Sequence, residues 1–102
     1  MRFVWRQFEI DEERFEVRSS GASIAIEPRV LELTLYLIRN RQRMVPKREL
    51  LEQVWCGYAV SGSVVDRCVC LARKTLADAT VIRTIYARGY QWAAPIDIRH
   101  DP

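Results

Sequence analysis

The sequence predicts a single α+β domain in which strands open and close the chain and three helices lie between them. Three observations carry this prediction. Aromatic and β-branched residues alternate with polar ones near the N-terminus, helical periodicity covers the middle, and a β-rich hairpin pattern containing a glycine follows. With 102 residues, 49% of them hydrophobic, the chain has the size and composition of one globular domain.

The first 27 residues are expected to form an antiparallel sheet of three or four short strands. Residues 3–10 form the first predicted strand, residues 15–17 the second and residues 23–27 the third, with turns at 11–13 and 19–21. The segment is rich in carboxylates, which would repel a polyanion, so we expect the sheet to lie away from any nucleic acid. These carboxylates are Glu9, Asp11, Glu12 and Glu13.

Three helices are predicted from apolar residues at helical spacing. The first begins at Pro28, where a missing N–H costs nothing, and ends near Asn40. The second follows Pro46 and covers residues 47–55, with Gly57 as the expected C-cap and a loop at 59–62. The third covers residues 63–76. Their apolar faces consist of Leu31, Leu35 and Ile38; of Leu50, Leu51, Val54 and Trp55; and of Val65, Val69, Ala72 and Leu76.

The third helix is predicted to have one buried face and one presented face. Ser63 and Asp66 have the spacing of a capping box at its start. At about 100° per residue, the side chains that point away from the apolar stripe are Arg67, Cys70, Leu71 and Lys74.

A β-hairpin is predicted after the third helix, from Val81 to Ala93. Its turn covers residues 86–89, where Gly89 is expected to take the positive φ that such a turn needs. Pro95 closes the ordered domain, which therefore covers residues 1–95. Residues 96–102 are expected to be a tail, or a linker to a further domain.

A basic run separates the first two helices and leaves two interpretations open. It contains Arg39, Arg41, Arg43, Lys47 and Arg48. One interpretation is a solvated loop and helix cap; the other is an edge that faces phosphates or a partner.

Composition narrows the function class. A net charge of +3 and a pI of about 9.0 are compatible with binding nucleic acid. No apolar run approaches the ~20 residues of a membrane span, and the charged N-terminus is unlike a signal peptide. The three cysteines suggest reduced thiols of a cytoplasmic protein, although a downstream membrane span would change that localisation.

No catalytic, cofactor or metal site is expected. The sequence shows no phosphate-cradling glycine loop, no nucleophile beside a histidine and no paired carboxylates on a pocket. Cys68 and Cys70 diverge by roughly 200° on a helix, and the only histidine is His100, so a shared metal ion is not expected. Cys70 is either a small filler residue or an exposed thiol whose oxidation would alter the presented face.

Several strings in this order resemble the OmpR/PhoB-type winged-helix DNA-binding domain, in the variant found at the N-terminus of ToxR/CadC-like regulators. They are IAIEPRVLELTLYLIRNRQRMVPKRELLEQVW, VVDRCVCLARKTLAD and VIRTIYARGYQW, which together cover residues 24–92. The resemblance implies sequence-specific binding of double-stranded DNA within a bacterial transcription regulator. It also implies that the third helix enters the major groove and that the hairpin, called the wing, meets the minor groove or the backbone.

Carried over by position, the resemblance places DNA contacts on the second helix, the third helix and the wing. Positions that are commonly basic in the family hold Cys70, Leu71 and Tyr86 here, and Pro46 replaces the usual serine before the second helix. The carried-over positions are Trp55, Ser63, Cys68, Cys70, Leu71, Arg73, Thr84, Tyr86 and Tyr90; Trp55 is the one we also expect in the core.

Combining the residues with the resemblance gives a predicted DNA-binding set. Arg67 and Lys74 suit guanine or phosphate, and Leu71 suits a thymine methyl. Arg88 suits a narrow minor groove, and Arg73 either a phosphate or an intramolecular acid. Thr84 and Tyr86 suit either phosphate or ordinary cross-strand pairing. The set is Ser63, Arg67, Cys70, Leu71, Arg73, Lys74, Thr84, Tyr86 and Arg88.

Two alternatives remain. The first is a protein-interaction module of the same fold, in which Cys70 and Leu71 dock RNA polymerase or a second copy of the chain. A homodimer on tandem half-sites would also be compatible with DNA binding. The second alternative is an enzyme whose catalytic domain lies downstream.

Overall fold

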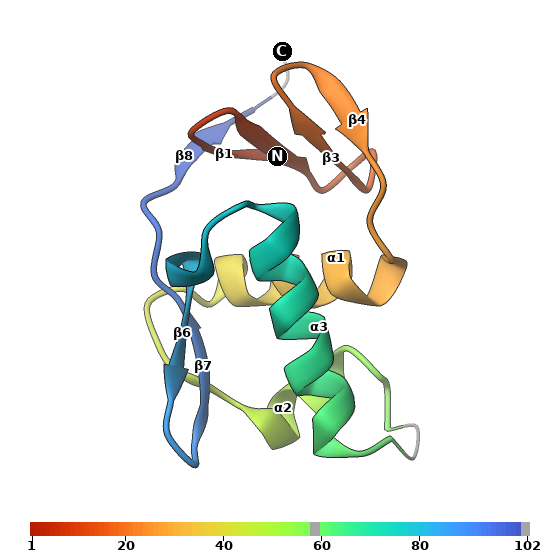
Figure 1. Cartoon of the computed structure of the whole chain (residues 1–102), viewed down its shortest axis with the longest axis vertical. Coiled ribbons are helices and arrows are strands. Elements are labelled where there is room, and N and C mark those ends of the chain that lie inside the picture. The colour runs from red at the N-terminus through yellow and green to blue at the C-terminus, as the bar shows by residue number, and fades with distance from the viewer. Residues whose placement is uncertain (58–59, 101–102) are drawn as a thin grey trace.

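The computed structural model describes residues 1–57 and 60–100. Two antiparallel sheets flank three helices (Figure 1). The first sheet has the order β4-β3-β2-β1-β8 and the second the order β5-β7-β6. The strands are β1 (Arg2–Trp5), β2 (Phe8–Asp11), β3 (Glu16–Ser19), β4 (Ala22–Ile24), β5 (Val45–Pro46), β6 (Ile82–Ile85), β7 (Gly89–Trp92) and β8 (Asp97–Arg99).

The five-stranded sheet departs from the predicted strands: β3 covers Glu16–Ser19 and not residues 15–17, and β4 covers Ala22–Ile24 and not residues 23–27. Residues 3–10 do not form one strand, because the chain reverses at Arg6, whose φ is 52°, and Trp5 then pairs with Phe8. Phe3 and Trp5 before the turn, and Phe8 and Ile10 after it, all point into the core. The alternating pattern therefore continued across a hairpin, which periodicity alone does not reveal.

The expectation that residues 96–102 are a tail or linker is corrected for its described part. Asp97–Arg99 form β8, which pairs antiparallel with β1 so that Arg2 lies opposite Arg99. The last strand thus returns to the sheet that opens the chain. This sheet lies at one end of the molecule and the tip of the hairpin at the other (Figure 1).

The helices are α1 (Pro28–Arg39), α2 (Lys47–Gln53) and α3 (Gly62–Thr75). The predicted bounds of α1 are confirmed, with Pro28 in its first turn and Asn40 as its C-cap. Helix α2 is shorter than predicted and ends at the C-cap Val54. Gly57 is therefore not the C-cap; it follows Cys56 in a reversal where both residues have positive φ, 77° and 52°. The loop expected at 59–62 lies partly outside the described residues, and Gly62 already belongs to α3.

The capping box predicted at the start of α3 is wrong. The N-cap is Ser61, no side chain caps the helix, and the Ser61 and Ser63 hydroxyls lie 2.6 Å apart. The carboxylate of Asp66 is not free to reach back, because Lys47 and Tyr90 bind it. Tertiary contacts thus replace the local cap.

The core confirms the predicted face of α3, since Val65, Val69, Ala72 and Leu76 are all buried. Helix α3 packs on α1 and α2, and its far end meets a short 3-10 turn, η1 (Ala79–Val81). The buried residues of α1, both sheets and α3 form one continuous cluster. The presented side of α3 is thereby fixed relative to both sheets.

The wing, residues 82–92, consists of β6, β7 and their turn. Its predicted glycine has another role: Ala87, not Gly89, takes the positive φ, 58°. Gly89 instead lies against β5, where an added Cβ would stand 2.1 Å from the Val45 carbonyl oxygen. The absence of a side chain lets the wing lie directly against the strand that precedes α2.

Candidate nucleic-acid interface

Helix α3 presents polar side chains along one side. Ser63, Arg67, Cys70 and Lys74 are exposed. Leu71 is only half-buried and, with Thr75, lines a shallow apolar hollow whose other wall is the segment from Ala25 to Val30. The structure thus brings four of the six predicted contact residues of α3 into solvent, whereas Leu71 partly packs against the protein itself and Arg73 is half-buried.

Arg67 is held by a carboxylate. Its Nη2 atom lies 3.1 Å from Oε2 and 3.4 Å from Oε1 of Glu27, which precedes α1. The Arg67 and Glu27 side chains are 60% and 55% exposed, so the ion pair stands in solvent. Such exposed pairs are weak and exchangeable.

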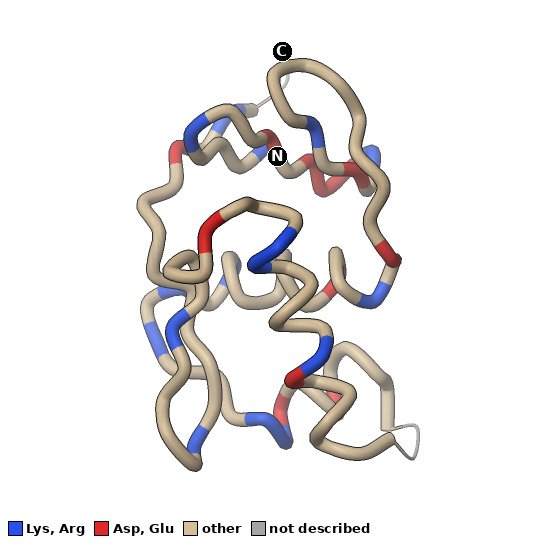
Figure 2. The backbone as a smooth tube through the Cα atoms, in the orientation of Figure 1, with Lys and Arg blue, Asp and Glu red and all other residues tan. Residues whose placement is uncertain are grey.

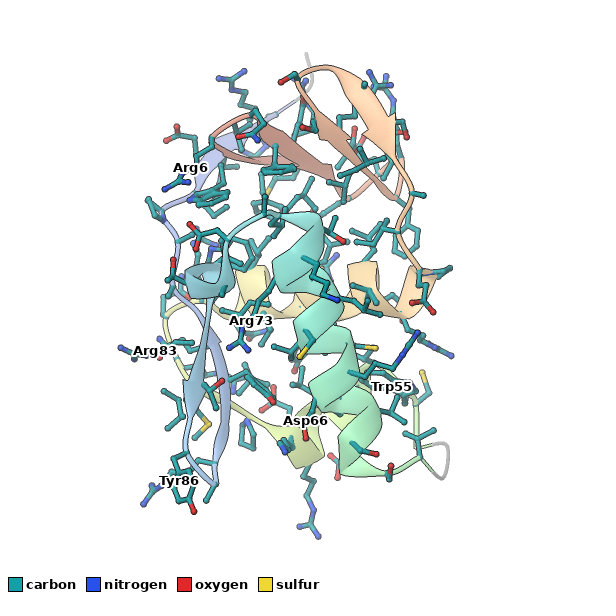
Figure 3. The ribbon with its side chains drawn as sticks, viewed as in Figure 1. Arg6, Trp55, Asp66, Arg73, Arg83 and Tyr86 are labelled. Carbon is teal, nitrogen blue, oxygen red and sulfur yellow. The ribbon has the colours of Figure 1, made fainter. Side chains whose placement is uncertain are left out.

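Arg73 joins α3 to the wing. Its Nη2 donates to the Ile82 carbonyl at 2.6 Å and to the Thr84 hydroxyl at 2.9 Å, and its Nε reaches the same carbonyl at 3.2 Å. The guanidinium also lies 6.0 Å from the centre of the Tyr90 ring. Figure 3 shows Arg73 in the space between the helix and the hairpin. Arg73 is thus bound to backbone and hydroxyl oxygens of the wing, and not to an acid.

Asp66 forms a second link between α3 and the wing. Its carboxylate accepts from the Tyr90 hydroxyl at 2.5 Å and from Lys47 Nζ of α2 at 2.8 Å. These two bonds hold the pKa of the Asp66 carboxyl group below its ordinary 3.8, and the bond from Lys47 has the larger effect. Burial and the bond to Asp66 raise the pKa of Tyr90 to about 12. Tyr90 therefore stays protonated and able to donate at neutral pH.

The wing tip stands out from the body of the domain. The Tyr86 side chain is 92% exposed, and Arg88 is exposed beside it. Figure 3 shows Tyr86 at the end of the hairpin. Thr84 lies further up β6, exposed but already accepting from Arg73. Its hydroxyl proton remains free to donate to a phosphate.

Three positions carried over from the family lie in the core. Trp55, Cys68 and Tyr90 are 5%, 2% and 6% exposed. Burial raises the pKa of the Cys68 thiol. Trp55 is core, as expected, and these side chains offer little surface to a ligand.

Part of the basic run between the first two helices consists of loop and cap residues, and part of it could face phosphates or a partner. Arg39 pairs with Glu12, Arg43 with Glu49, and Arg41 donates to the Ile38 carbonyl at the end of α1. These three side chains are loop and cap groups. Arg48, in the first turn of α2, is exposed and is not a member of the predicted contact set. Only its place in the basic run pointed to it.

Some cations remain unpaired within residues 1–57 and 60–100. The side chains of Arg48, Lys74 and Arg88 are exposed and have no hydrogen bond or ion pair to another described residue. They come from α2, α3 and the wing, which we call together the helix–wing region. Figure 2 shows acidic and basic positions interspersed on the first sheet, and further basic positions along α3 and the wing. Among the described residues Arg99 of β8 is also exposed and without such a partner, so the helix–wing region carries three of these four free cations. A polyanion would therefore meet most of the free positive charge there.

Two further observations concern other kinds of site. Among the described residues, no helix is long and apolar enough to cross a membrane. Within the same residues, no three His, Cys, Asp or Glu side chains lie close enough together to hold a metal ion.

A three-helix domain whose last helix is presented beside a β-hairpin is a winged-helix domain. The family described as "Transcriptional regulatory protein, C terminal" matches residues 21–92. The chain belongs to this family, so the predicted OmpR/PhoB-type winged-helix domain of a bacterial transcription regulator is confirmed. The family also agrees with the prediction that this domain is not an enzyme.

The chain is similar to two curated transcription regulators, CadC and HilA. Transcriptional activator CadC of Escherichia coli is 26% identical over 79% of the chain, and transcriptional regulator HilA of Salmonella typhi is 26% identical over 99% of it. The chain spans only 17% and 19% of the lengths of these two proteins.

Solved structures confirm the fold. The DNA-binding domain of E. coli CadC superposes with a TM-score of 0.82 at 21% identity, covering 94% of each chain. The Thermotoga maritima response regulator DrrB, an OmpR/PhoB homologue, gives 0.79 at 29% identity over 91% of this chain and 44% of its own. The Klebsiella pneumoniae RstA DNA-binding domain, solved in complex with the RstA box, gives 0.75 at 21% identity over 90% of this chain and 96% of its own.

Proposed function

We propose that this domain binds double-stranded DNA sequence-specifically, with α3 in the major groove and the wing on the minor groove or the backbone. The observation that carries the proposal is the unpaired positive charge of Arg48, Lys74 and Arg88 on the helix–wing region. A DNA-bound relative, the RstA domain, has the same fold. Because the chain spans less than a fifth of CadC and HilA, the activity of the whole protein is part of the proposal.

The side chains take different roles in the proposed complex. Arg67 and Lys74 contact bases, and Ser63 and Cys70 lie on the same exposed side of α3. Arg88 enters the minor groove or meets its backbone, while Thr84, Tyr86 and Arg48 donate to phosphates. Arg73 acts by fixing the wing, and only the exposed edge of Leu71 is available to a thymine methyl.

Selection of bound sequences from a random duplex pool is the most informative experiment. It tests binding and returns the preferred site together. On that site, log affinity should fall linearly with log salt, with a slope of roughly −0.9 for each phosphate neutralised. Undetectable or salt-independent binding to every duplex would overturn the proposal.

Two variants separate base reading from backbone contact. Arg67→Ala should change which sequences the pool returns, because a base contact is lost. Arg88→Ala should weaken selected and random duplexes by a similar factor if the side chain meets backbone. The reverse pattern would contradict these assignments.

The alternative is that the same face docks RNA polymerase or a second copy of the chain. The apolar patch available for this is small, because Leu71 is half-buried and, of this pair, only Cys70 is exposed. We therefore favour DNA as the ligand of this face. A homodimer on tandem half-sites and a contact with RNA polymerase are additional proposals. The proposed compartment is the cytoplasm. A sedimentation concentration series without DNA, compared with a mobility shift on random duplex, separates self-association from DNA binding.

A further inference from the structure

We propose that Glu27 limits the affinity and specificity of this domain by competing with DNA for Arg67. The inference rests on the proposed function, since it assigns a role to a neighbour of a proposed base-reading side chain. Glu27 lies on the segment between β4 and α1, forty residues before Arg67, and points its carboxylate at the guanidinium. It is not among the expected contact residues.

The geometry of the pair makes it a competitor and not a permanent brace. Both carboxylate oxygens lie within 3.4 Å of a single nitrogen, Nη2 of Arg67, and both side chains are more than half exposed. A pair in this setting is screened by water and salt, so a better partner displaces it. Burial does not lock it in place.

Arg67 differs from the other cations of its helix. Of the three basic side chains of α3, a helix that the structure describes throughout, Arg73 is bound to wing oxygens and Lys74 has no partner. Arg67 alone pairs with a carboxylate. Lys74 is available to any duplex, whereas Arg67 must first leave Glu27.

This arrangement costs the right sequence more than wrong ones. At the correct site Arg67 exchanges one charged partner for a bidentate contact with guanine O6 and N7, and the Glu27 carboxylate is left unpaired. At other sites no such contact is available, so Arg67 stays with Glu27 and no pair has to be broken. Because specificity is the difference between the two affinities, a cost that arises only at the correct site lowers it.

The experiment measures the affinity of the 102-residue chain for its selected duplex and for a random duplex, with and without Glu27→Gln. The variant should bind the selected duplex about fivefold more tightly and random duplex less than about twofold more tightly, so that the specificity ratio rises.

Glu32→Gln is the matched control. It removes the same charge from α1, where Glu32 pairs with Arg29 at 3.0 Å and lines a different hollow with Glu12 and Tyr36. It should leave the specificity ratio unchanged. In an Arg67→Ala background, Glu27→Gln should also leave the ratio unchanged, because its effect passes through Arg67.

The outcomes are distinct. An unchanged or lower ratio in Glu27→Gln, an equal effect of Glu32→Gln, or a persistent effect without Arg67 each overturns the role of Glu27 while leaving DNA binding intact. Failure of the unaltered chain to bind any duplex overturns the proposed function itself. Circular dichroism of both exposed-site variants confirms that the comparison is between folded proteins.

Discussion

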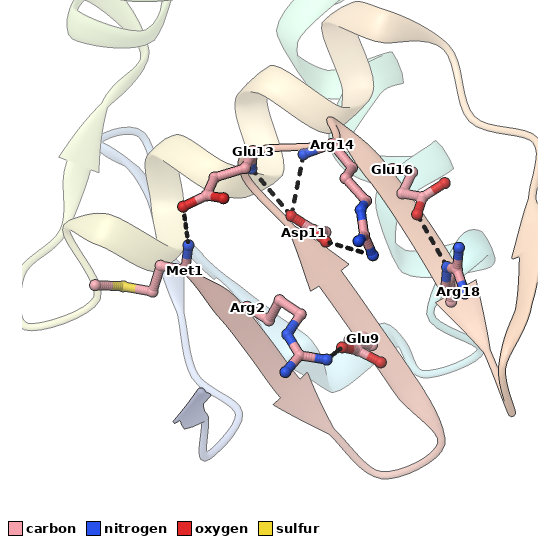
Figure 4. A network of polar contacts seen from close by, with 8 residues as sticks. All are labelled: Met1, Arg2, Glu9, Asp11, Glu13, Arg14, Glu16 and Arg18. Atoms are coloured by element: carbon pink, nitrogen blue, oxygen red, sulfur yellow. Dashed lines mark hydrogen bonds and ion pairs between the residues drawn. The ribbon is translucent and has the colours of Figure 1, made fainter. Parts of the chain in front are cut away.

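The arginine side chains of β1, β2, β3 and their turns end on carboxylates, whereas several cations of the helix–wing region, and Arg99 of β8, end in solvent. Arg2 pairs with Glu9, Arg6 with Asp78, Arg14 with Asp11 and Arg18 with Glu16. Figure 4 shows three of these pairs beside one another on the sheet. Residues 1–27 carry six acidic and four basic side chains, and residues 28–102 carry seven acidic and twelve basic ones.

The difference teaches how a domain of net charge only +3 is oriented toward a polyanion. Nearly neutral overall charge gives little attraction at long range, but a largely acid-paired sheet at one end and most of the unpaired cations elsewhere create a gradient across the molecule. The predictions below test what holds the helix–wing region together and whether its charge is used differently from that of the sheet.

The largest effect is expected from Gly89→Ala. The new Cβ would stand 2.1 Å from the Val45 carbonyl oxygen, so β7 must move away from β5. Overpacking against backbone should lower the free energy of unfolding by about 3 kcal/mol in urea denaturation. Gly62→Ala, where nothing lies within 4 Å of the new Cβ, is the control and should be nearly neutral. Equal losses in both variants would refute the close-approach explanation.

A smaller loss is expected from Arg73→Met, which removes the hydrogen bonds to Ile82 and Thr84 but keeps an apolar stem. Hydrogen bonds from a charged group suggest a loss of about 1.5 kcal/mol in the free energy of unfolding. DNA affinity should fall as well, because the wing loses its link to α3. Arg83 lies on β6, and its guanidinium reaches only Gln91 within the wing. Arg83→Met should therefore change stability little. A larger loss for Arg83→Met would contradict the assignment of the link to Arg73.

The contrast in charge use is tested directly by Arg48→Ala and Arg18→Ala. Each removes one positive charge, but Arg48 is unpaired on α2 and Arg18 is paired with Glu16 on the first sheet. Loss of one phosphate contact should reduce duplex affinity about fivefold at low salt for Arg48→Ala. Arg18→Ala should be within about twofold of the unaltered chain. Fluorescence anisotropy titrations measure both, and equal losses would show that the two ends are not used differently.

The smallest effect is expected from the ionisation of the Asp66 carboxyl group, which makes the free energy of unfolding depend on pH. Lys47 and Tyr90 lower its pKa below 3.8 in the folded chain, so the unfolded chain binds more protons near that pH. The stabilisation is therefore present above that value and is lost as the pH falls through the folded pKa. Asp66→Asn should be less stable at neutral pH, by under about 1 kcal/mol for so exposed a group, and should lose less stability on acidification. Thermal unfolding from pH 7 downward measures this, with Asp97→Asn on β8 as control.

Much of the fold follows from local patterns. The period of apolar residues identified α1 with its bounds and the buried stripe of α3, because both depend on residues a few positions apart. The three residues of β8 are all exposed and show no such pattern. Their strand exists only because β1, at the other end of the chain, offers an edge.

The site was less predictable, because its contacts join residues that are far apart in the sequence. The spacing of Ser63 and Asp66 suggested a local cap, but the partners of Asp66 are Lys47 and Tyr90, 19 and 24 residues away. The role of Gly89 depends on Val45 in another strand. The exposed face of α3 was evident from sequence, whereas which cations on it are already paired depends on contacts such as that of Glu27.

The two bridges from α3 to the wing, through Arg73 and Asp66, have a consequence for how an operator is read. Because the helix and the hairpin are braced against each other, neither can settle on its own base pairs without moving the other. In the proposed complex, the energies of base pairs beneath the helix and beneath the wing then cease to be independent. An operator description that adds one term per position would fail most for pairs of positions that span the two elements.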